Sequence, residues 1–397
     1  MSALVTGGGI ICALGTSEAE VLASFRQHRG GMSAAKFLQT RHRDGYVFGE
    51  VALSNQELAQ LHSLNPTLSR TILLSYHAAR AAYDSIPAEL LSTARVGFIS
   101  ATSVGGMDKT EQFFEDYQGD EVGGDLGQVL HHDCGRATDF VARELGIKGF
   151  VTTISTACSS SANALMLGAR MLEAGLLDIV IAGGADALTR FTFNGFNTLM
   201  IVDPLQCKPL DAAREGLNLG EGAAYLVLMN EQNAAALPAP VHCRLSGYAN
   251  TNDAFHQTAL SEQGDGPYLA MRQALHKSGL QPADINYINM HGTGTRNNDL
   301  AEGNAIRRLF DGVYPKLSST KSFTGHTLAA SGAIEAYLSV LAVNGGYVFP
   351  NFFFNQPVET LDLVPETEFY QYPHMRHVLS NSFGFGGNCS SLIFSRT

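Results

Sequence analysis

The sequence is short of charge, of paired cysteines and of long apolar runs, and each shortage excludes a class of protein. Charged residues make up only 16% of the 397 positions, too few for a coiled coil, and hydrophobic residues make up 45%, too many for a disordered chain. The 26 Lys and Arg against 37 Asp and Glu leave a net charge of −11. A broad nucleic-acid-binding surface is therefore not expected.

The cysteines are scattered and include no C-x-x-C pair: Cys12, Cys134, Cys158, Cys207, Cys243 and Cys389. This spacing argues against a disulfide framework and a structural zinc site, so we expect no bound metal and a reducing compartment, the cytoplasm. No segment approaches roughly 18 consecutive apolar residues, so a conventional membrane span is not expected. The first residues read as a strand and a turn rather than as a signal peptide.

Short β-type runs alternate with longer helical patterns along most of the chain. Residues 96–100, 178–182 and 224–228 read as buried strands. Apolar residues recur at helical spacing over 69–83 and 162–174. This alternation predicts an α/β fold whose sheets are largely buried. At about 150 residues per domain, the length allows two to three domains.

Residues 231–240 (EQNAAALPAP) have no strand or amphipathic pattern and are the best candidate for a boundary. We therefore expect two halves, residues 1–240 with Cys158 and residues 241–397 with the histidine motifs. The halves echo each other faintly, because 151–165 and 379–394 each lead from a strand into a turn of small residues. Backbone amides can converge at such turns.

Cys158 lies where a strand-like run ends and a helix begins, among the small residues of TACSSSANAL. Small neighbours allow a side chain to stand clear at a sharp turn, as in the strand–turn–helix elbow of hydrolases. The positive end of a helix favours the thiolate, which is the nucleophilic form of cysteine. An isolated cysteine is more often buried and inert, but this setting favours a nucleophile.

Two histidines occupy glycine-containing turns. His291 follows a strand-like run in NMHGTGT, and His326 lies near the start of a helical stretch in KSFTGHTLAASG. Taken alone, His291 reads better as an ordinary loop histidine, and neither His326 nor its charged neighbours are decisive by themselves. The helix dipole lowers the pKa of an imidazole at a helix start, so we expect His326 to be neutral. Lys321 and Glu335 flank His326 and, taken singly, read as surface or capping charges.

The motif NSFGFGG, residues 381–387, alternates glycine with phenylalanine and suits a turn that is both tight and apolar. One interpretation is a structural bulge whose phenylalanines belong to the core. In the functional interpretation, the backbone N–H of Phe385 supplies half of an oxyanion hole and its ring acts as a gate.

Taken in this order, the motifs around Cys158, His291, Lys321 with His326, and Phe385 resemble those of the β-ketoacyl-acyl-carrier-protein synthase family. The resemblance runs from VTGGGI near the start to SSLIF near the end. It implies the thiolase fold, in which two similar halves stack as five layers, α–β–α–β–α, normally in a dimer.

The resemblance implies a decarboxylative Claisen condensation in fatty-acid or type II polyketide or polyene biosynthesis. Cys158 would take an acyl group from a carrier-protein thioester, with the N–H groups of Cys158 and Phe385 as the oxyanion hole. His291 and His326 would donate hydrogen bonds to the enolate oxygen that forms when a malonyl thioester loses CO2.

Supporting and binding residues are also implied by the resemblance. Lys321 and Glu335 would form a charged pair that fixes His326. Threonines would contact the phosphopantetheine arm, and a valine would bound the acyl pocket. The residues implied to contact substrate are Thr258, Thr293, Thr295, Val104 and Phe383.

The implied partner is acyl carrier protein, whose phosphopantetheine arm delivers the substrates, so no bound cofactor is expected. Arg70 and Lys208 are candidate docking cations. Because this chain and carrier proteins are both acidic, docking should weaken with salt. A homodimer and a heterodimer with a chain-length-factor-like paralogue both remain open.

Three departures from the family pattern suggest a divergent branch. Leu210 replaces the usual aromatic residue, GEGAA replaces GEGAG, and RNN follows HGTGT. Polyketide or polyene synthesis by separate subunits is then favoured over fatty-acid elongation. One alternative is a non-catalytic chain-length-factor-like subunit, which Cys158 and both histidines argue against. Another is a thiolase or Cys–His hydrolase; a thiolase needs a second cysteine, for which Cys389 is the candidate.

Overall fold

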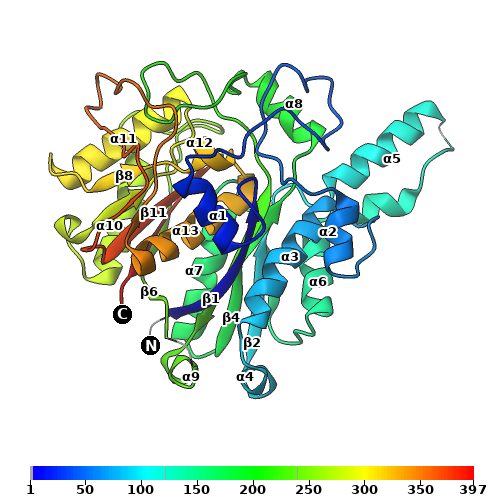
Figure 1. Ribbon diagram of the computed structural model, residues 1–397, viewed down its shortest axis with the longest axis horizontal. Helices are drawn as coiled ribbons and strands as arrows, with labels where there is room; N and C mark the ends of the chain where they lie inside the picture. The colour runs from blue at the N-terminus through cyan, green and yellow to red at the C-terminus, as the bar shows by residue number, and fades with distance from the viewer. Residues whose placement is uncertain (1–2, 121, 239) are drawn as a thin grey trace.

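The computed structural model describes residues 3–120, 122–238 and 240–397 (Figure 1). Five strands belong to the first part of the chain: β1 (Ala3–Cys12), β2 (Val96–Ala101), β3 (Val151–Ile154), β4 (Ile179–Asp186) and β5 (Gly222–Met229). Five belong to the second: β6 (Cys243–Asn252), β7 (Tyr287–Asn289), β8 (Lys316–Ser318), β11 (His377–Gly384) and β12 (Asn388–Ser395). They form one hydrogen-bonded sheet in the order β3-β2-β4-β5-β1-β6-β12-β11-β7-β8. A separate two-stranded sheet joins β9 (Tyr347–Val348) to β10 (Tyr370–Gln371).

The two halves of the large sheet have the same topology. In the first half β3, β2 and β4 run parallel, and β5 and β1 follow in antiparallel pairing. In the second half β8, β7 and β11 run parallel, and β12 and β6 follow in the same way. The similarity between residues 151–165 and 379–394 therefore does not reflect equivalent positions in the two halves. In the structure, the equivalent of residues 151–165 is β8 and the residues that follow it.

Helices cover the outer face of each half and fill the space between the halves. α3 (Arg70–Asp84) and α6 (Cys134–Glu144) pack on the outside of the first half. α7 (Ser160–Glu173) and α13 (Ser331–Gly345) lie between the halves. α10 (Asp265–Ser278) and α11 (Arg296–Phe310) cover the outside of the second half. The result is the expected five layers, α–β–α–β–α (Figure 1).

The other helical segments are shorter or lie at the periphery. α5 and the residues that follow it project from the rest of the molecule (Figure 1). These segments are α1 (Glu18–Arg26), α2 (Asn55–Leu61), α4 (Ala88–Thr93), α5 (Met107–Gly119), η1 (Leu126–His131), α8 (Arg190–Thr198), α9 (Glu231–Ala235), η2 (Pro282–Asp284), α12 (Lys321–Thr324) and η3 (Leu328–Ala330).

The strands and helices read from the sequence agree with the structure to within a few residues. The three predicted strands correspond to β2, β4 and β5, and the two predicted helices to α3 and α7. Ser69 begins α3 as expected of an N-cap, because its side chain accepts a hydrogen bond from the N–H of Ile72. The stretch 231–240 is not wholly irregular: it begins with α9, capped by Asn230, and its residue 239 lies outside the described residues.

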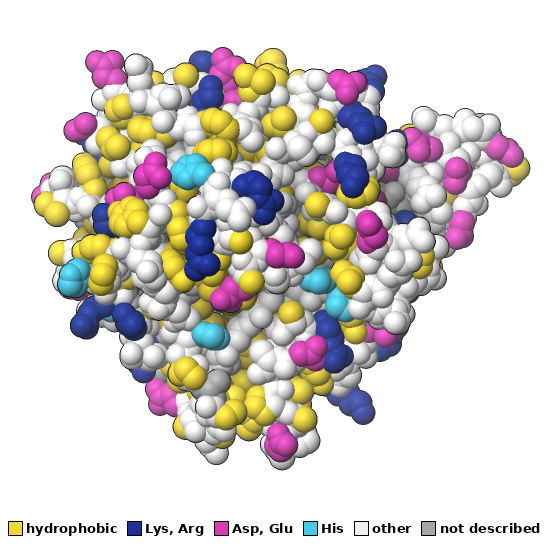
Figure 2. All heavy atoms as spheres, viewed as in Figure 1, with side chains coloured by type: hydrophobic (Ala, Val, Ile, Leu, Met, Phe, Trp, Pro, Cys, Tyr) yellow, Lys and Arg dark blue, Asp and Glu magenta, His cyan; other side chains and the backbone are white. Residues whose placement is uncertain are grey.

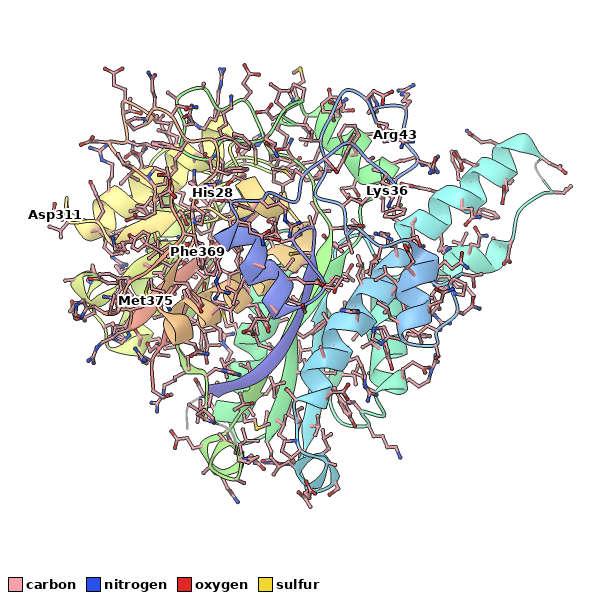
Figure 3. The ribbon with its side chains drawn as sticks, in the orientation of Figure 1. His28, Lys36, Arg43, Asp311, Phe369 and Met375 are labelled. Carbon is pink, nitrogen blue, oxygen red and sulfur yellow. The ribbon has the colours of Figure 1, made fainter. Side chains whose placement is uncertain are left out.

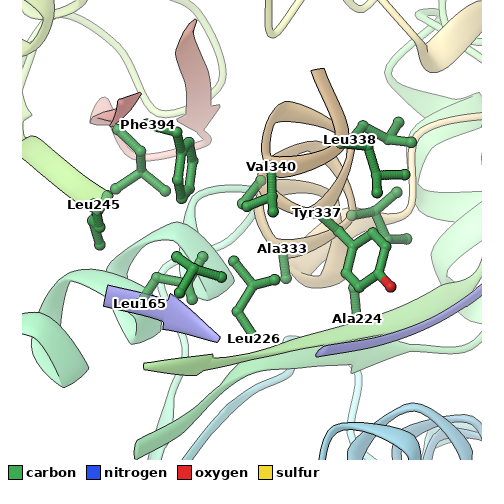
Figure 4. Packing of buried hydrophobic residues seen from close by; sticks show 14 of the residues in the cluster. Leu165, Ala224, Leu226, Leu245, Ala333, Tyr337, Leu338, Val340 and Phe394 are labelled. Carbon is green, nitrogen blue, oxygen red and sulfur yellow. The ribbon is translucent and has the colours of Figure 1, made fainter. Parts of the chain in front are cut away.

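The largest hydrophobic cluster lies between the two halves and is built on α7 and α13 (Figure 4). Leu165 and Val340 meet side chains from both halves there, among them Leu226 and Leu245. The segment Leu328–Gly345 is long and apolar enough to cross a membrane by length and composition, but 89% of it is buried inside the protein. It serves as the central core helix of this fold.

Arg70 belongs to the interior rather than to a docking surface. Its Nη2 lies 2.6 Å from Oε1 of the buried Glu221, and the same group donates to the carbonyl oxygens of Val51 and Leu53. Its Nη1 donates to the side chain of Asn55. The predicted docking role of Arg70 is therefore wrong, because its donors are all engaged inside the protein.

Replacing Arg70 by methionine should lower the free energy of unfolding by about 3–5 kcal/mol, because the Glu221 carboxylate stays buried without its cation. Urea unfolding followed by circular dichroism measures this loss. The matched control is Arg80→Met, which breaks an exposed pair with Asp84 and should cost less than about 1 kcal/mol. Equal losses in the two variants would contradict the structural role assigned to Arg70.

Candidate functional site

A cavity of about 700 Å³ lies at the carboxyl ends of parallel strands from both halves, and Cys158, His291 and His326 line it. The three residues follow β3, β7 and β8, so equivalent ends of the two half-sheets bring them together. The rest of the lining comes from Tyr46 and from within segments 196–204, 215–217, 258–260, 293–298 and 383–387. The sulfur and both imidazoles predicted from the sequence therefore share one cavity.

Cys158 lies on an elbow between β3 and α7. Ala157 adopts a left-handed conformation with φ of 53°, which costs a non-glycine residue about 1–2 kcal/mol. Burial raises the pKa of the Cys158 thiol to about 12, although the Lys321 charge and the Phe385 N–H both act to lower it. The resting side chain is thus a thiol. The expectation that the helix start would produce a thiolate is wrong, because the loss of solvation outweighs it.

The β11–β12 hairpin holds the backbone N–H of Phe385 close enough to Cys158 to lower the pKa of its thiol. Gly384 permits the approach. A Cβ at this position would stand 2.8 Å from the carbonyl oxygen of Thr156 and 3.2 Å from the amide nitrogen of Cys158. Gly384 is therefore required by the close contact between the backbone of the hairpin and the backbone around Cys158.

The two phenylalanines of the same hairpin both line the cavity. The ring of Phe385 stacks on Phe196 of α8, with ring centroids 5.5 Å apart. Phe383 is buried and contacts the ring of His291 edge-on, with centroids 5.6 Å apart. The hairpin thus supplies a backbone amide near the sulfur and two aromatic side chains to the cavity lining.

His291 is held by a buried ion pair. The Lys321 ammonium contacts the Glu335 carboxylate and lies 3.3 Å from Nδ1 of His291. Because an ammonium only donates, Nδ1 accepts, and we assign the ring proton to Nε2. Burial and the Lys321 charge lower the pKa of His291 well below its ordinary value of 6.5. His291 is therefore a neutral ring with its remaining donor free for the cavity.

His326 is neutral in the same tautomer. Its Nδ1 accepts from the N–H of Leu328 at 3.2 Å and lies 2.9 Å from Oγ of Ser331, so its proton belongs on Nε2. Burial first, and then the Lys321 charge, lower its pKa well below 6.5. The neutral ring expected from the sequence is present, but burial rather than the helix dipole accounts for it. The rings of His326 and His291 meet edge to face, with centroids 5.3 Å apart.

The Lys321–Glu335 pair forms as expected, but it contacts a different histidine. Lys321 touches His291, whereas His326 is held by its own turn and by α13. Glu335 is also not an exposed or capping residue, because burial raises its pKa to about 7 against the opposing effect of Lys321.

Three buried side chains each have polar atoms without a hydrogen-bond partner among the described residues. They are Oε2 of Glu335, the amide of Asn289 and Oγ of Ser380. Asn289 and Ser380 are register partners on the parallel strands β7 and β11. Oxygen groups of this kind suit a water molecule or a small cation.

Glu302 of α11 was not predicted and anchors the His291 turn. Its carboxylate accepts the N–H groups of His291 at 2.9 Å and Gly292 at 2.8 Å, and the side-chain amide of Asn381 at 3.0 Å. Burial raises its pKa to about 7. The sequence signal that could have found it is a carboxylate on an alanine-rich helix face directly after the HGTGT turn.

The predicted substrate-contacting threonines all reach the cavity, and the predicted valine does not. Thr258, Thr293 and Thr295 line it, with the hydroxyl oxygens of Thr293 and Thr295 2.9 Å apart. Val104 lies outside the lining, in a hydrophobic cluster that also holds the lining residue Leu217. Within this chain, Val104 therefore supports the wall rather than forming it.

Comparison with known proteins agrees with this geometry. Residues 58–234 match the family model "Beta-ketoacyl synthase, N-terminal domain", and residues 242–355 match "Beta-ketoacyl synthase, C-terminal domain". The chain belongs to the β-ketoacyl synthase family. Nodulation protein E of Rhizobium meliloti (strain 1021) is 30% identical over 402 residues, which cover 99% of this chain and 98% of that protein. The 3-oxoacyl-[acyl-carrier-protein] synthase 2 of Staphylococcus aureus (strain COL) is 36% identical over 270 residues, 66% and 65% of the two chains.

Solved structures of this family share the whole fold. "The ishigamide ketosynthase/chain length factor" superposes with a TM-score of 0.94 at 29% identity, covering 100% of this chain and 99% of the other. A type II polyketide ketosynthase in complex with its acyl-carrier protein, AntDE:AntF, gives 0.90 at 25% identity, with 100% and 99% covered. The five-layered architecture of this member of the β-ketoacyl synthase family is therefore the thiolase fold.

Removing the Lys321 charge should move the pKa of both His291 and His326 upward toward 6.5, because that charge helps to lower both. The double substitution Lys321→Met with Glu335→Gln avoids leaving a buried carboxylate unpaired. Histidine signals followed by NMR during a pH titration measure the change. In the control variant Lys316→Met, which loses a surface pair with Glu366, both histidines should titrate as before. Unmoved titrations in the double variant would show that Lys321 does not set the state of the rings.

Proposed function

We propose that this chain is an active β-ketoacyl-acyl-carrier-protein synthase, which joins an acyl group on Cys158 to a malonyl group carried by acyl carrier protein. The observation that carries the proposal is one cavity lined by Cys158, His291 and His326, with Nδ1 of each imidazole engaged and Nε2–H left as the donor. The similarity to a type II polyketide ketosynthase supports a role in type II polyketide synthesis over fatty-acid elongation.

In the first step the Cys158 sulfur attacks the thioester carbonyl of the acyl carrier. The new carbon–sulfur bond replaces the bond to the carrier, whose thiol leaves with the proton that Cys158 gives up. Charge develops on the carbonyl oxygen, and the N–H groups of Cys158 and Phe385 are the donors for it. A buried thiol with pKa of about 12 reacts at neutral pH only if deprotonation accompanies the attack.

In the second step a malonyl thioester loses CO2, and the electron pair moves onto the thioester oxygen as an enolate. Two neutral imidazoles that present Nε2–H can both donate to that oxygen without a change of protonation. The enolate carbon then attacks the carbonyl carbon on Cys158. A carbon–carbon bond forms, the carbon–sulfur bond breaks, and the sulfur leaves as a thiolate that takes a proton from water. Thr258, Thr293 and Thr295 are placed along the cavity wall to position the phosphopantetheine arm.

Neither alternative fits the site as well. A non-catalytic chain-length-factor-like subunit has no need of a nucleophile together with two oriented imidazoles. A thiolase needs a second cysteine at the reacting carbon, but Cys389 is buried outside the cavity lining, and its sulfur contacts the carbonyl oxygen of Gly387. Burial also raises the pKa of Cys389, which opposes a role as a base.

We further propose that the chain works paired with a second subunit of the same fold, a copy of itself or a chain-length-factor-like paralogue. β3 is an edge strand of the sheet and leads directly to Cys158. The projecting α5 and the residues after it expose Phe114, Val122, Leu126 and Leu130, an apolar set that suits coverage by a partner. The steps above need no bound cofactor beyond the carrier's own arm.

Substitution of the proposed nucleophile and of one imidazole should separate the two steps. Cys158→Ala should abolish acylation by an acyl carrier protein, whereas His326→Ala should still be acylated but lose condensation about 100- to 1,000-fold, as expected when one of two oxyanion donors is removed. Intact-protein mass spectrometry reads the acyl adduct, and product analysis reads condensation. Cys207→Ala, which removes a buried thiol outside the cavity lining, is the matched control. An acyl adduct that persists in Cys158→Ala would contradict the assignment of Cys158 as the nucleophile.

Gly384→Ala should slow acylation of Cys158 about 100-fold, because the added Cβ forces the Phe385 amide away from the developing oxyanion. The rate is measured with an acyl carrier protein by quenched-flow mass spectrometry. Gly195→Ala on α8 also lies in the cavity region, but a Cβ there meets nothing within 4 Å, so this variant should acylate normally. Equal rates in the two variants would mean that the Phe385 amide plays no part.

A further inference from the structure

One cluster of uncharged polar side chains lies against the elbow that carries Cys158, residues 155–159. Exposed charges are distributed differently. Lys and Arg are interspersed with Asp and Glu over the face of the molecule in Figure 2, and Lys36, Arg43 and Asp311 stand at exposed positions on its outside (Figure 3). The members of the polar cluster are Thr156 and Ser159 on the elbow, Asn163 on α7, Asn250 on β6, and Asn388 and Ser390 on β12. Hydrogen bonds therefore connect the elbow to strands of the second half of the sheet.

The side-chain oxygen of Asn388 lies at the centre of the polar cluster. Oγ of Ser159 lies 2.6 Å from it, Nδ2 of Asn250 2.7 Å and Nδ2 of Asn163 2.9 Å. A carboxamide nitrogen only donates, so the atom that two such groups surround is the oxygen, which assigns the orientation of the Asn388 side chain. Three donors on one oxygen hold this side chain more firmly than a single hydrogen bond would.

Two of these donors also bind the elbow at Thr156. Oγ of Ser159 lies 2.8 Å from the carbonyl oxygen of Thr156, and Nδ2 of Asn163 donates to the Thr156 hydroxyl at 2.8 Å. Ser159 is buried, and Asn163 and Asn388 are half-buried, so competition from water for these hydrogen bonds is reduced. Asn388 is therefore connected to the elbow on both sides of Cys158.

Asn388 also closes the β11–β12 hairpin. Gly384 and Asn388 are register partners, and residues 385–387 form the turn between them. At one end of the turn, Gly384 packs against the backbone of the elbow. At the other end, Asn388 hydrogen-bonds Ser159. The turn that carries the N–H of Phe385 is therefore attached to the elbow at both of its ends.

We infer that Asn388 is a positioning residue for the proposed oxyanion hole. Its hydrogen bond to Ser159 fixes how far the hairpin turn stands from the elbow, and so sets the separation between the N–H groups of Phe385 and Cys158. This inference rests on the proposed function, in which those two groups stabilise the oxyanion. Such donors are effective only when they are already aimed at the atom that gains charge. Asn388 lies outside the cavity lining, so it acts through the hairpin backbone and not by contact with substrate.

The experiment compares two reactions of Cys158 in the full chain. Acylation by the small thioester hexanoyl-N-acetylcysteamine passes through an oxyanion, whereas alkylation by iodoacetamide displaces iodide directly and forms no oxyanion. In Asn388→Ala the acylation rate at saturating thioester should fall about tenfold, less than on loss of a donor, because Gly384 still holds the other end of the turn. The KM for the thioester and the rate of alkylation should stay within about twofold of wild type. Mass spectrometry of the peptide that contains Cys158 measures both reactions.

Two further substitutions test whether the hydrogen bond between Ser159 and Asn388 is responsible. Ser159→Ala removes the other partner and should slow acylation to a similar extent, which also covers the case in which Asn388→Ala fails to fold. The double variant should be no slower than the slower single variant, because both changes break the same bond. The matched control is Asn250→Ala. Asn250 donates to the same oxygen but forms no hydrogen bond with the elbow in the part of the chain that the structure describes, so this variant should acylate like wild type.

Each other outcome contradicts the inference. Wild-type acylation rates in both Asn388→Ala and Ser159→Ala would overturn it and leave the proposed function intact. Equal losses of acylation and alkylation would place the effect on the thiol and not on the N–H donors. Losses that multiply in the double variant, or an equal loss in Asn250→Ala, would show that the bond to Ser159 is not what matters. A wild-type chain that is alkylated at Cys158 but acylated by neither the thioester nor a hexanoyl acyl carrier protein would overturn the proposed function itself.

Discussion

The Lys321 ammonium lies between the Glu335 carboxylate and Nδ1 of His291, and the chemistry of the site depends on this contact. A cation this deeply buried persists only because a carboxylate compensates the loss of water. Once present, it fixes the tautomer of His291 and lowers the pKa of both histidines. Two rings that stay neutral at physiological pH are hydrogen-bond donors of constant charge. The ion pair therefore supports the proposed reaction through the histidines rather than by contact with the reacting atoms.

The position of the ion pair depends in turn on how closely α13 approaches α7. Ser161 accepts a hydrogen bond from the N–H of Ala333 at 2.8 Å, which ties the first turns of the two helices together. Gly332 allows this contact, because a Cβ there would stand 2.8 Å from the amide nitrogen of Ala162. The small residues in the two motifs are thus explained by helix contact in the core as well as by the turns themselves.

Much of the fold and of the site could be predicted from the sequence, because turn residues and apolar periodicity are local patterns of a few consecutive residues. The turn residues around Cys158 and His291 pointed to side chains that the structure brings to one cavity, and apolar periodicity located α3 and α7. What failed depended on long-range surroundings. The thiol pKa of Cys158 and the burial of Arg70 follow from neighbours more than a hundred residues away, such as Lys321 and Glu221.

The sequence also could not predict which side chains contact each other. A charged pair was expected beside His326, but only the three-dimensional structure shows that Lys321 reaches His291 instead. The sequence did not single out Glu302, because a carboxylate on a helix normally faces water. In the structure its carboxylate accepts a hydrogen bond from the backbone N–H of His291. Docking cations could not be assigned from composition, since whether an arginine is free or already paired depends on the folded surface.

The equivalence of the two half-sheets has a further consequence. β3 and β8 occupy the same place in their respective halves, and the crossovers that leave them carry Cys158 and Lys321. Cys158 and the Lys321 that contacts His291 therefore follow equivalent edge strands of the two half-sheets. Neither half contains the whole cavity by itself, so a proteolytic cut that separated the halves would destroy the proposed activity even where each half remained folded.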